Sequence, residues 1–438
     1  MRIIIGNQTE DTLQNMNSDD RIFSQRVIWF AKDDDVIILS DKPDITFLKY
    51  ATSLTGTDLR TLKFLIPPQE RFSGKHFDQY SLTDKNFISE VLGCINEVTE
   101  IIPMWPSPAI SHFAKEIGLL NAFKGAQFFS QYGVELVNNK AYFRALSASA
   151  NIPIALGEVC HDIVEAKYAL RRLLKVTDAV IIKQVHNGAG VGNELIIKNS
   201  ASKLDDIGAK YVYYLKPENN AINKYLTQRW NWASFNERHP VVIEKFQTGC
   251  QTIYAEFYAT DSGICHTQTG RLGYQNHRLV EEIVPLDGIP KIDREKLIDY
   301  GSQLAKLYQS IGYRGYLSAD ALIDKNGNIT FTEMNARIGG SLHIYNSIGK
   351  RVVKYTQDPK RAIAQYHAPL NWRSLNFDTF LTNLEKLGYL YDPNIRKGVI
   401  IPFPILPEVG GFVSFCIVYQ TEEERNEIYE KLDNQFRT

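Results

Sequence analysis

Two apolar, strand-like segments late in the chain are separated by a short polar turn. The turn contains Asn326-Gly327, and Asn-Gly is the strongest short-range signal for a two-residue β-hairpin turn. If this pair occupies the two central turn positions, Asp320 lies directly opposite Glu333. Asn335 is two residues beyond Glu333 and therefore points to the same face of the sheet. The hairpin, expected over residues 317–337, thus brings two carboxyl groups and an amide together.

Two carboxylates that face each other across a sheet repel, unless a cation lies between them. Oxygen atoms from Asp320, Glu333 and Asn335 form the kind of ligand set that Mg²⁺ prefers, completed by water and phosphate oxygens; Mn²⁺ is a second candidate. The alternative is a solvated hairpin tip with ordinary surface acids. Against it, the same register would place three apolar side chains on this face: Leu322, Ile329 and Phe331. The sequence therefore predicts a metal site.

Composition places the chain among ordinary globular proteins. Its 438 residues are 44% hydrophobic and 23% charged, with a formal charge of −1, so no global field attracts nucleic acid or an anionic membrane. The five cysteines are scattered without CxxC spacing, which favours free thiols in a reducing compartment. No apolar run approaches the roughly 18 residues of a membrane span. We expect a cytoplasmic protein that binds neither nucleic acid nor a membrane.

The pattern of elements divides the chain into three parts, of α/β and α+β class. Residues 1–130 alternate short apolar strands with helical segments, as in an open α/β sheet. Residues 131–365 carry two helical segments, then a series of strands, a long helix expected over 294–311, and the metal hairpin. Residues 366–438 are expected to form a small C-terminal α+β domain.

A second constellation is an apolar strand, a glycine-rich loop and another apolar strand. Lys183 lies in the first strand, and the loop, near residues 186–193, carries Gly188, Gly190 and Gly192. Since no helix follows, this is neither a Walker loop nor a dinucleotide fingerprint. A hairpin flap of this kind can fold its backbone N–H groups over a phosphate, and a buried lysine needs an anion. The alternative is a flexible turn beside a lysine whose ammonium reaches solvent.

In this order the motifs resemble the ATP-grasp superfamily, over roughly residues 131–345. The resemblance implies that ATP lies between two α+β lobes. It assigns the nucleotide-binding role to Lys140, Lys183, His186 with the three loop glycines, and the segment Glu244-Lys245-Phe246. It makes Asp320, Glu333 and Asn335 the metal ligands, and Arg337 and Arg278 the catalytic residues beside the phosphates.

Several of these residues also have plainer interpretations. Lys140 could be a surface lysine, although the start of a helix is an unfavourable place for a cation. Glu244 could be an ordinary acid at a strand end, and Arg278 could form a surface ion pair. His186 could merely shape the loop tip.

A narrower resemblance is to the pheganomycin-type peptide ligases. It rests on the N-terminal region, with its turn at residues 6–10, which looks like a pre-ATP-grasp domain, and on the Gly-Gly-Ser-Leu-His segment 339–343 after Arg337. It implies substrate contacts from Gly340, Ser341 and His343, although a structural role for His343 is the more ordinary interpretation. The C-terminal part, with its Gly410-Gly411 pair, would be a small closing domain.

The resemblance implies a carboxylate–amine ligase that forms an amide or peptide bond through an acyl phosphate and releases ADP and phosphate. Its partners would be a small-molecule or peptide carboxylate, an amine or peptide acceptor, and a second copy of the chain in a homodimer. Two alternatives stay open. One is a phosphotransferase or carboxylase that uses the same ATP site, and the other is a nucleotide-binding regulatory protein without turnover.

Overall fold

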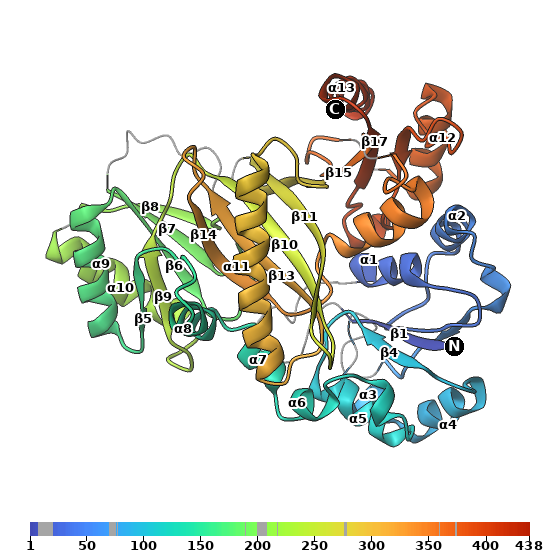
Figure 1. Ribbon diagram of the computed structural model, residues 1–438, viewed down its shortest axis with the longest axis horizontal. Helices are drawn as coiled ribbons and strands as arrows, with labels where there is room; N and C mark the ends of the chain where they lie inside the picture. The colour runs from blue at the N-terminus through green and yellow to red at the C-terminus, as the bar shows by residue number, and fades with distance from the viewer. Residues whose placement is uncertain are drawn as a thin grey trace.

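A computed structural model describes residues 1–7, 21–69, 76, 78–188, 190–198, 208–216, 218–275, 278–358, 360–372 and 375–438. Its strands form three sheets of four, five and eight strands. Figure 1 shows the five-stranded sheet with its helices at one end of the molecule and the eight-stranded sheet in the middle. The N-terminal domain lies at the other end, beside the C-terminal elements. None of the helices in these ranges is both long and apolar enough to cross a bilayer.

The N-terminal sheet is fully parallel and has the order β3-β2-β1-β4. Its strands are β1 (Arg2–Gly6), β2 (Val36–Leu39), β3 (Lys63–Leu65) and β4 (Glu100–Pro103). The isoleucines of β1 are fully buried, because helices cover both faces of a sheet of this kind. These helices include α2 (Ile45–Thr55), α4 (Lys85–Cys94) and α5 (Pro108–Glu116). The open α/β architecture predicted for the N-terminal region is confirmed.

One predicted helix of this domain differs in type. The pattern of residues 21–30 predicts one helix, but the segment is a single α-helical turn, α1 (Arg21–Ser24), followed by the 3₁₀ segment η1 (Gln25–Phe30). All six residues of η1 are buried, and its β-branched and aromatic side chains are weak helix formers. Of the turn at residues 6–10, only Gly6 and Asn7 fall in the described ranges.

The five-stranded sheet has the order β5-β9-β6-β7-β8. Its strands are β5 (Gly157–Cys160), β6 (Ala179–Gln184), β7 (Asn193–Ile197), β8 (Tyr211–Tyr214) and β9 (Val241–Lys245). The amphipathic helices α9 (Ile163–Val176) and α10 (Asn219–Ala233) pack on one face and form a separate core with it. The other face of the sheet is therefore left for the site.

The eight-stranded sheet has the order β14-β13-β10-β11-β12-β15-β17-β16 and neighbouring strands are antiparallel. Its first part consists of β10 (Gln251–Ala259), β11 (Ile264–Gln275), β12 (Arg278–Val284), β13 (Gly315–Ile323) and β14 (Ile329–Asn335). The long helix α11 (Lys291–Ser310) crosses one face, and apolar residues such as Phe257 and Leu304 form the core beneath it. The opposite face carries polar side chains.

The C-terminal strands extend this same sheet. β15 (Ala362–His367), β16 (Gly398–Ile400) and β17 (Ser414–Tyr419) follow β12 in the strand order. The helices α12 (Phe377–Leu387) and α13 (Glu422–Phe436) belong to this region, and β15 follows a π-helical segment, η4 (His343–Val353). The boundary predicted at residue 365 falls inside β15, so the chain after it is continuous with the central sheet.

Candidate active site

The hairpin of β13 and β14 pairs Asp320 with Glu333 and Ser318 with Asn335, as the sequence predicts for the two acids. The two-residue turn assumed for Asn326-Gly327 would be of type I′. That prediction is wrong, because Asn326 does not have the positive φ that such a turn requires. Instead, the N–H of Gly327 donates to the Asp324 carbonyl, with Gly327 at φ 79°. This is a three-residue loop that shifts the pairing by one residue.

A β-bulge restores the predicted pairing. The register shifts between Asp320 and Ala321, where Thr332 is the extra residue of β14. A bulge moves the side chains beyond it to the other face of the strand. Phe331 and Ile329 therefore lie in the core under α11, and the prediction that they share the face of the acids is wrong. Leu322 does line the same cavity as Asp320.

The acid pair is linked by hydrogen bonds within the face. The Asn335 amide donates to Asp320 at 2.9 Å and to Glu333 at 3.5 Å, and the Ser318 hydroxyl donates to Asp320 at 2.9 Å. Burial and the neighbouring Glu333 carboxylate raise the pKa of Asp320 well above its usual value. Burial also raises the pKa of Glu333, but the ammonium groups of Lys140 and Lys183 outweigh it and lower that pKa to about 2. The pKa values of the two carboxyl groups are thus shifted in opposite directions.

This donor set fits a divalent hard cation. Two carboxyl groups converge, and burial together with the repulsion by Glu333 raises the pKa of Asp320, which Ser318 and Arg337 offset only in part. A hydroxyl and an amide lie within hydrogen-bond distance. Among the described residues, no group of three or more His, Cys, Asp or Glu side chains forms a metal cluster. A cation here would therefore depend on ligands from outside the chain, as Mg²⁺ with phosphate oxygens does.

Lys140 joins the acid pair to the glycine loop. It is the first residue of α8 (Lys140–Ser149), which Asn139 caps through hydrogen bonds from Ala141 N and Tyr142 N. The Lys140 ammonium is 3.0 Å from Glu333 and donates to the Asn187 carbonyl at 2.5 Å. Its side chain is almost fully buried, so the interpretation as a surface lysine does not hold.

The loop connects β6 and β7, which pair antiparallel as predicted. Gly190 has φ 72°, and a Cβ at this position would lie 2.9 Å from the Gly208 carbonyl oxygen. At Gly192 a Cβ would lie 2.5 Å from Cβ of Asn187, so this glycine permits the loop's own packing. Gly188 and Gly190 line cavities, and the position between them lies outside the described residues.

His186 lies at the base of this loop. Its ring is 3.3 Å from the Asn139 amide and packs edge-on against His239. Burial, followed by the nearby His239 and Lys140, lowers the pKa of His186 to about 4. The imidazole is therefore neutral at physiological pH and supplies hydrogen bonds rather than charge.

On the facing sheet, Glu244 lies between two cations. Its carboxylate is 2.5 Å from the Lys183 ammonium and accepts from Arg144 at 2.6 Å. All three side chains are buried. Lys183 therefore has an anionic partner within the protein, and both residues line the cavity between the sheets.

That cavity has a volume of about 390 Å³. It lies between the polar faces of the five- and eight-stranded sheets and extends along the connection from β9 to β10. Its lining includes six of the nine nucleotide-binding residues predicted from the sequence, and two of the three predicted metal ligands: Lys140, Lys183, Gly190, Glu244, Lys245 and Phe246, with Asp320 and Glu333. A volume of this size is typical of small-molecule sites. Most of the predicted nucleotide-binding residues thus lie around one cavity.

Arg337 follows the end of β14 and lies beside the acid pair. Its guanidinium donates to Asn138 at 3.1 Å and lies 4.3 Å from the centre of the Trp105 ring. Asn138 also accepts from Ala336 N and so fixes the chain between Asn335 and Arg337. Burial lowers the pKa of Arg337, although Glu333 and Asp320 raise it. Arg337 thus lines a small pocket together with Gly188 of the glycine loop and Glu333 of the acid pair.

Other predicted site residues lie outside these cavities. Arg278 is exposed at the start of β12 and lines none of the cavities described here, so its catalytic role stays a prediction. The Ser341 hydroxyl donates to buried Glu256, and a Cβ on Gly340 would lie 3.5 Å from Glu282. His343 is fully buried and 2.8 Å from the Gln365 amide oxygen, which favours the structural interpretation.

The residues of the site that were not predicted include Trp105, Asn138 and Arg144. Arg144 is four residues after Lys140, on the same face of α8, and that spacing could have indicated it. Trp105 and Asn138 act on Arg337 from more than 190 residues away in the sequence, and no local pattern connects them.

Known proteins share this architecture. Residues 24–119 match the sequence model of the pre-ATP-grasp domain family, while no curated protein sequence is significantly similar to the chain. An ADP complex of N5-carboxyaminoimidazole ribonucleotide synthetase superposes with a TM-score of 0.59 at 12% identity, covering 98% of this chain and 95% of that one. The L-amino acid ligase from Bacillus licheniformis gives 0.55 at 13% identity, covering 99% and 97%. The chain has the ATP-grasp fold with a pre-ATP-grasp domain.

A third ATP-grasp structure extends the likeness. The biotin carboxylase domain of the Hydrogenobacter thermophilus 2-oxoglutarate carboxylase, complexed with MgADP, superposes with a TM-score of 0.57 at 15% identity, covering 96% of this chain and 86% of that one. These identities are low, so the likeness concerns the fold. The ATP-grasp fold predicted from the sequence is confirmed. The narrower resemblance to pheganomycin-type peptide ligases stays a prediction.

Proposed function

We propose that the protein is an ATP-dependent carboxylate–amine ligase that forms an amide or peptide bond. ATP would occupy the cavity between the two sheets. Lys183 would neutralise its phosphates under the glycine loop, and Lys140 would do so where the loop meets Glu333. Asp320, Glu333 and Asn335 would hold Mg²⁺, which supplies charge neutralisation at the phosphates when it is bound.

In the first step, a carboxylate oxygen of the substrate attacks the γ-phosphorus of ATP. The bond from that phosphorus to the β–γ bridging oxygen breaks, ADP leaves, and an acyl phosphate forms. Arg337 is positioned to stabilise the charge on the moving phosphoryl group, because its planar fork matches phosphate oxygens. Trp105 and Asn138 hold it in place.

In the second step, the amine nitrogen of the acceptor attacks the acyl carbon. The bond from that carbon to the phosphate oxygen breaks, phosphate leaves with the electron pair, and the amine loses its proton to solvent or phosphate. The acyl phosphate must be kept from water. Closure of the glycine loop over the cavity would do this.

The observation that carries this proposal is the meeting of Lys140, Glu333, Asn335 and Arg337 around one small pocket that adjoins the nucleotide cavity. A nucleotide-binding protein without turnover has no need for an arginine beside the metal ligands. The L-amino acid ligase among the similar structures supports a ligase, and the carboxylating enzymes among them keep the phosphotransferase or carboxylase class as the alternative.

The test is ADP release by the purified protein with Mg²⁺, measured against amino acids and short peptides offered singly and in pairs, with mass spectrometry of the products. We expect ADP release that requires two components together and yields a product lighter than their sum by one water. ADP release with a single component, giving a stable phosphorylated product, would favour a phosphotransferase. Bicarbonate-dependent release would favour a carboxylase.

A further inference from the structure

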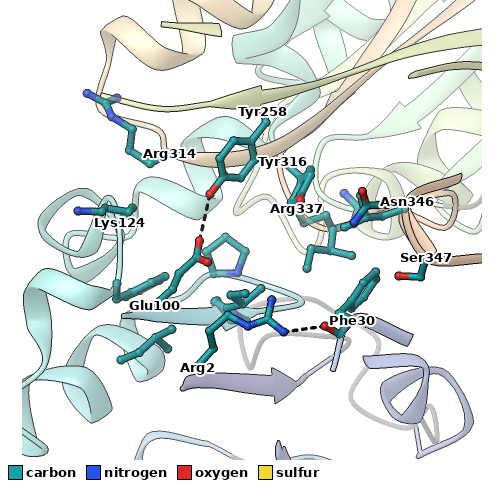
Figure 2. A pocket seen from close by; sticks show the side chains of 18 of the residues that line it. Arg2, Phe30, Glu100, Lys124, Tyr258, Arg314, Tyr316, Arg337, Asn346 and Ser347 are labelled. Atoms are coloured by element: carbon teal, nitrogen blue, oxygen red, sulfur yellow. Dashed lines mark hydrogen bonds between the residues drawn. The ribbon is translucent and has the colours of Figure 1, made fainter. Parts of the chain in front are cut away.

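A second cavity, of about 470 Å³, lies between the N-terminal sheet and the far end of the central sheet. Figure 2 shows Tyr258 and Tyr316 above the amino ends of the N-terminal strands, which contribute Arg2 and Glu100. Tyr316 precedes Asp320 by four residues on β13, a separation of roughly 13 Å along the strand. This cavity is therefore distinct from the one between the two sheets.

Arg337 connects the two. It lines the second cavity and also the small pocket that contains Lys140 and Glu333. Lys140 and Glu333 in turn line the nucleotide cavity. The three cavities thus adjoin one another in series. The side chain of Arg337 lies between the reacting groups and the second cavity.

The second cavity is strongly basic. Six of its lining residues are cationic and one, Glu100, is acidic. Two of the cations are already paired, Arg2 with Asp35 and Arg314 with Asp261. Lys32 and Lys124 are exposed, and no ion pair of either is found among the described residues. Glu100 accepts a hydrogen bond from Tyr258 at 3.2 Å. An excess of unpaired positive charge in a concave site indicates an anionic ligand.

We propose that this cavity binds the amine acceptor, and that the acceptor is an amino acid or short peptide with a free carboxylate. The inference rests on the proposed ligase function. Lys124 and Arg314 lie at one end of the cavity and Arg337 at the other. The acceptor's carboxylate would lie at the Lys124 end, and its amine would point toward Arg337, where the acyl phosphate forms.

The lining between the two ends suits such a molecule. Tyr258, Tyr316 and Phe123 provide aromatic surface for an apolar side chain or the peptide plane. A free amino acid carries its amine and carboxylate on one carbon, so a longer acceptor spans the cavity better. We therefore expect short peptides to be used more efficiently than single amino acids.

The experiment compares each accepted dipeptide acceptor with its C-terminal amide, by kcat/KM for the acceptor at saturating ATP and carboxylate. The wild-type protein should prefer the free acid by about tenfold, the scale of one charge-assisted contact. Lys124→Glu should reduce this preference by about fivefold or more, while KM for ATP is unchanged. The matched control is Lys431→Glu, the same change of charge at an exposed position on α13.

A second variant tests the cavity by volume. Asn346→Trp places a bulky ring near the Arg337 end and should raise KM for the acceptor without changing KM for ATP. Equal use of acid and amide by the wild type, or a preference unaltered in Lys124→Glu, would overturn the inference while leaving the ligase intact. If no pair of substrates is ligated by the wild type, the proposed function itself fails, and this inference with it.

Discussion

At Arg337, one guanidinium faces the acid pair on one side and an open cavity on the other. Its charge matters most while the phosphoryl group moves, since an arginine in that role contributes roughly 10³–10⁵ in rate. We expect Arg337→Met to bind Mg·ATP within a few-fold of wild type and to lose at least about a hundredfold in turnover. Nucleotide affinity by calorimetry and product formation should be measured on one sample.

The conservative control is Arg337→Lys, which keeps the charge and loses the fork. It should recover only part of the rate, because an ammonium cannot bind two phosphate oxygens as a planar pair. Arg337→Met could instead lower nucleotide affinity and melting temperature together and leave the remaining folded protein fully active. Arg337 would then have a structural role, through its contacts with Asn138 and Trp105.

Lys183 supports a separate prediction about binding. Lys183→Ala removes a cation from the nucleotide cavity and leaves Glu244 paired with Arg144 alone. Both effects oppose a triphosphate, so ATP affinity should fall at least about tenfold. The control is Lys175→Ala, an exposed lysine on α9 of the same lobe. Equal affinities of the two variants by calorimetry would remove Lys183 from the nucleotide site.

At the scale of elements, the metal hairpin shows what local sequence can and cannot predict. The pairing of Asp320 with Glu333 is correct, yet the turn assumed for it is wrong. A three-residue loop and a bulge at Thr332 shift the register in opposite directions and cancel. The bulge depends on packing under α11, where Phe331 is buried. The residues of the turn therefore do not predict it. The strand order could not be predicted from local sequence either, because long connections separate β15 and β17 from β12 in the chain.

The strands of the central sheet also bring buried charge together. Glu282 of β12 is buried, and burial raises its pKa to about 7, with Glu256 adding to the rise and Tyr254 and Arg26 opposing it. Because the folded-state pKa lies above the usual 4.5, the folded state binds this proton more tightly than the unfolded state. Its stabilisation is complete below the usual pKa and is lost as pH rises through about 7.

We therefore expect Glu282→Gln to lose part of the pH dependence of stability. Between about pH 5 and about pH 8, the free energy of unfolding of the wild type relative to the variant should fall by an amount on the order of 2–3 kcal/mol. Urea unfolding at both pH values measures it, with the exposed Glu385→Gln on α12 as control. A difference that does not change with pH would mean that Glu282 titrates normally.

At the scale of the whole molecule, one arginine makes several hydrogen bonds from η4 to the N-terminal domain. Arg351 of η4 donates to the carbonyls of Trp29, Ala31 and Thr55 and to the Thr57 hydroxyl. All four acceptors belong to the pre-ATP-grasp domain, so the guanidinium is satisfied without a carboxylate. The sequence does not predict these hydrogen bonds, because no motif links η4 to the segments that accept them.

Arg351→Met should destabilise the protein by about 2–4 kcal/mol, because it leaves buried carbonyl groups without donors. Chemical denaturation should show a lower midpoint or two separate transitions, the first from the N-terminal domain. The exposed Lys386→Met on α12 is the control for loss of one positive charge. A single transition at the wild-type midpoint would show that Arg351 does not contribute to holding the domains together.

The position of Lys140 has a thermodynamic consequence for the whole molecule. One ammonium touches both the loop carbonyl of Asn187 and the carboxylate of Glu333, and it has three hydrogens to share. Any ligand that lowers the negative charge at Glu333 therefore changes the energy of the loop position, and any displacement of the loop changes the affinity at Glu333. Linkage makes the two effects equal in size. A nucleotide and a divalent cation should accordingly bind with heterotropic cooperativity, each changing the affinity of the other by the same factor.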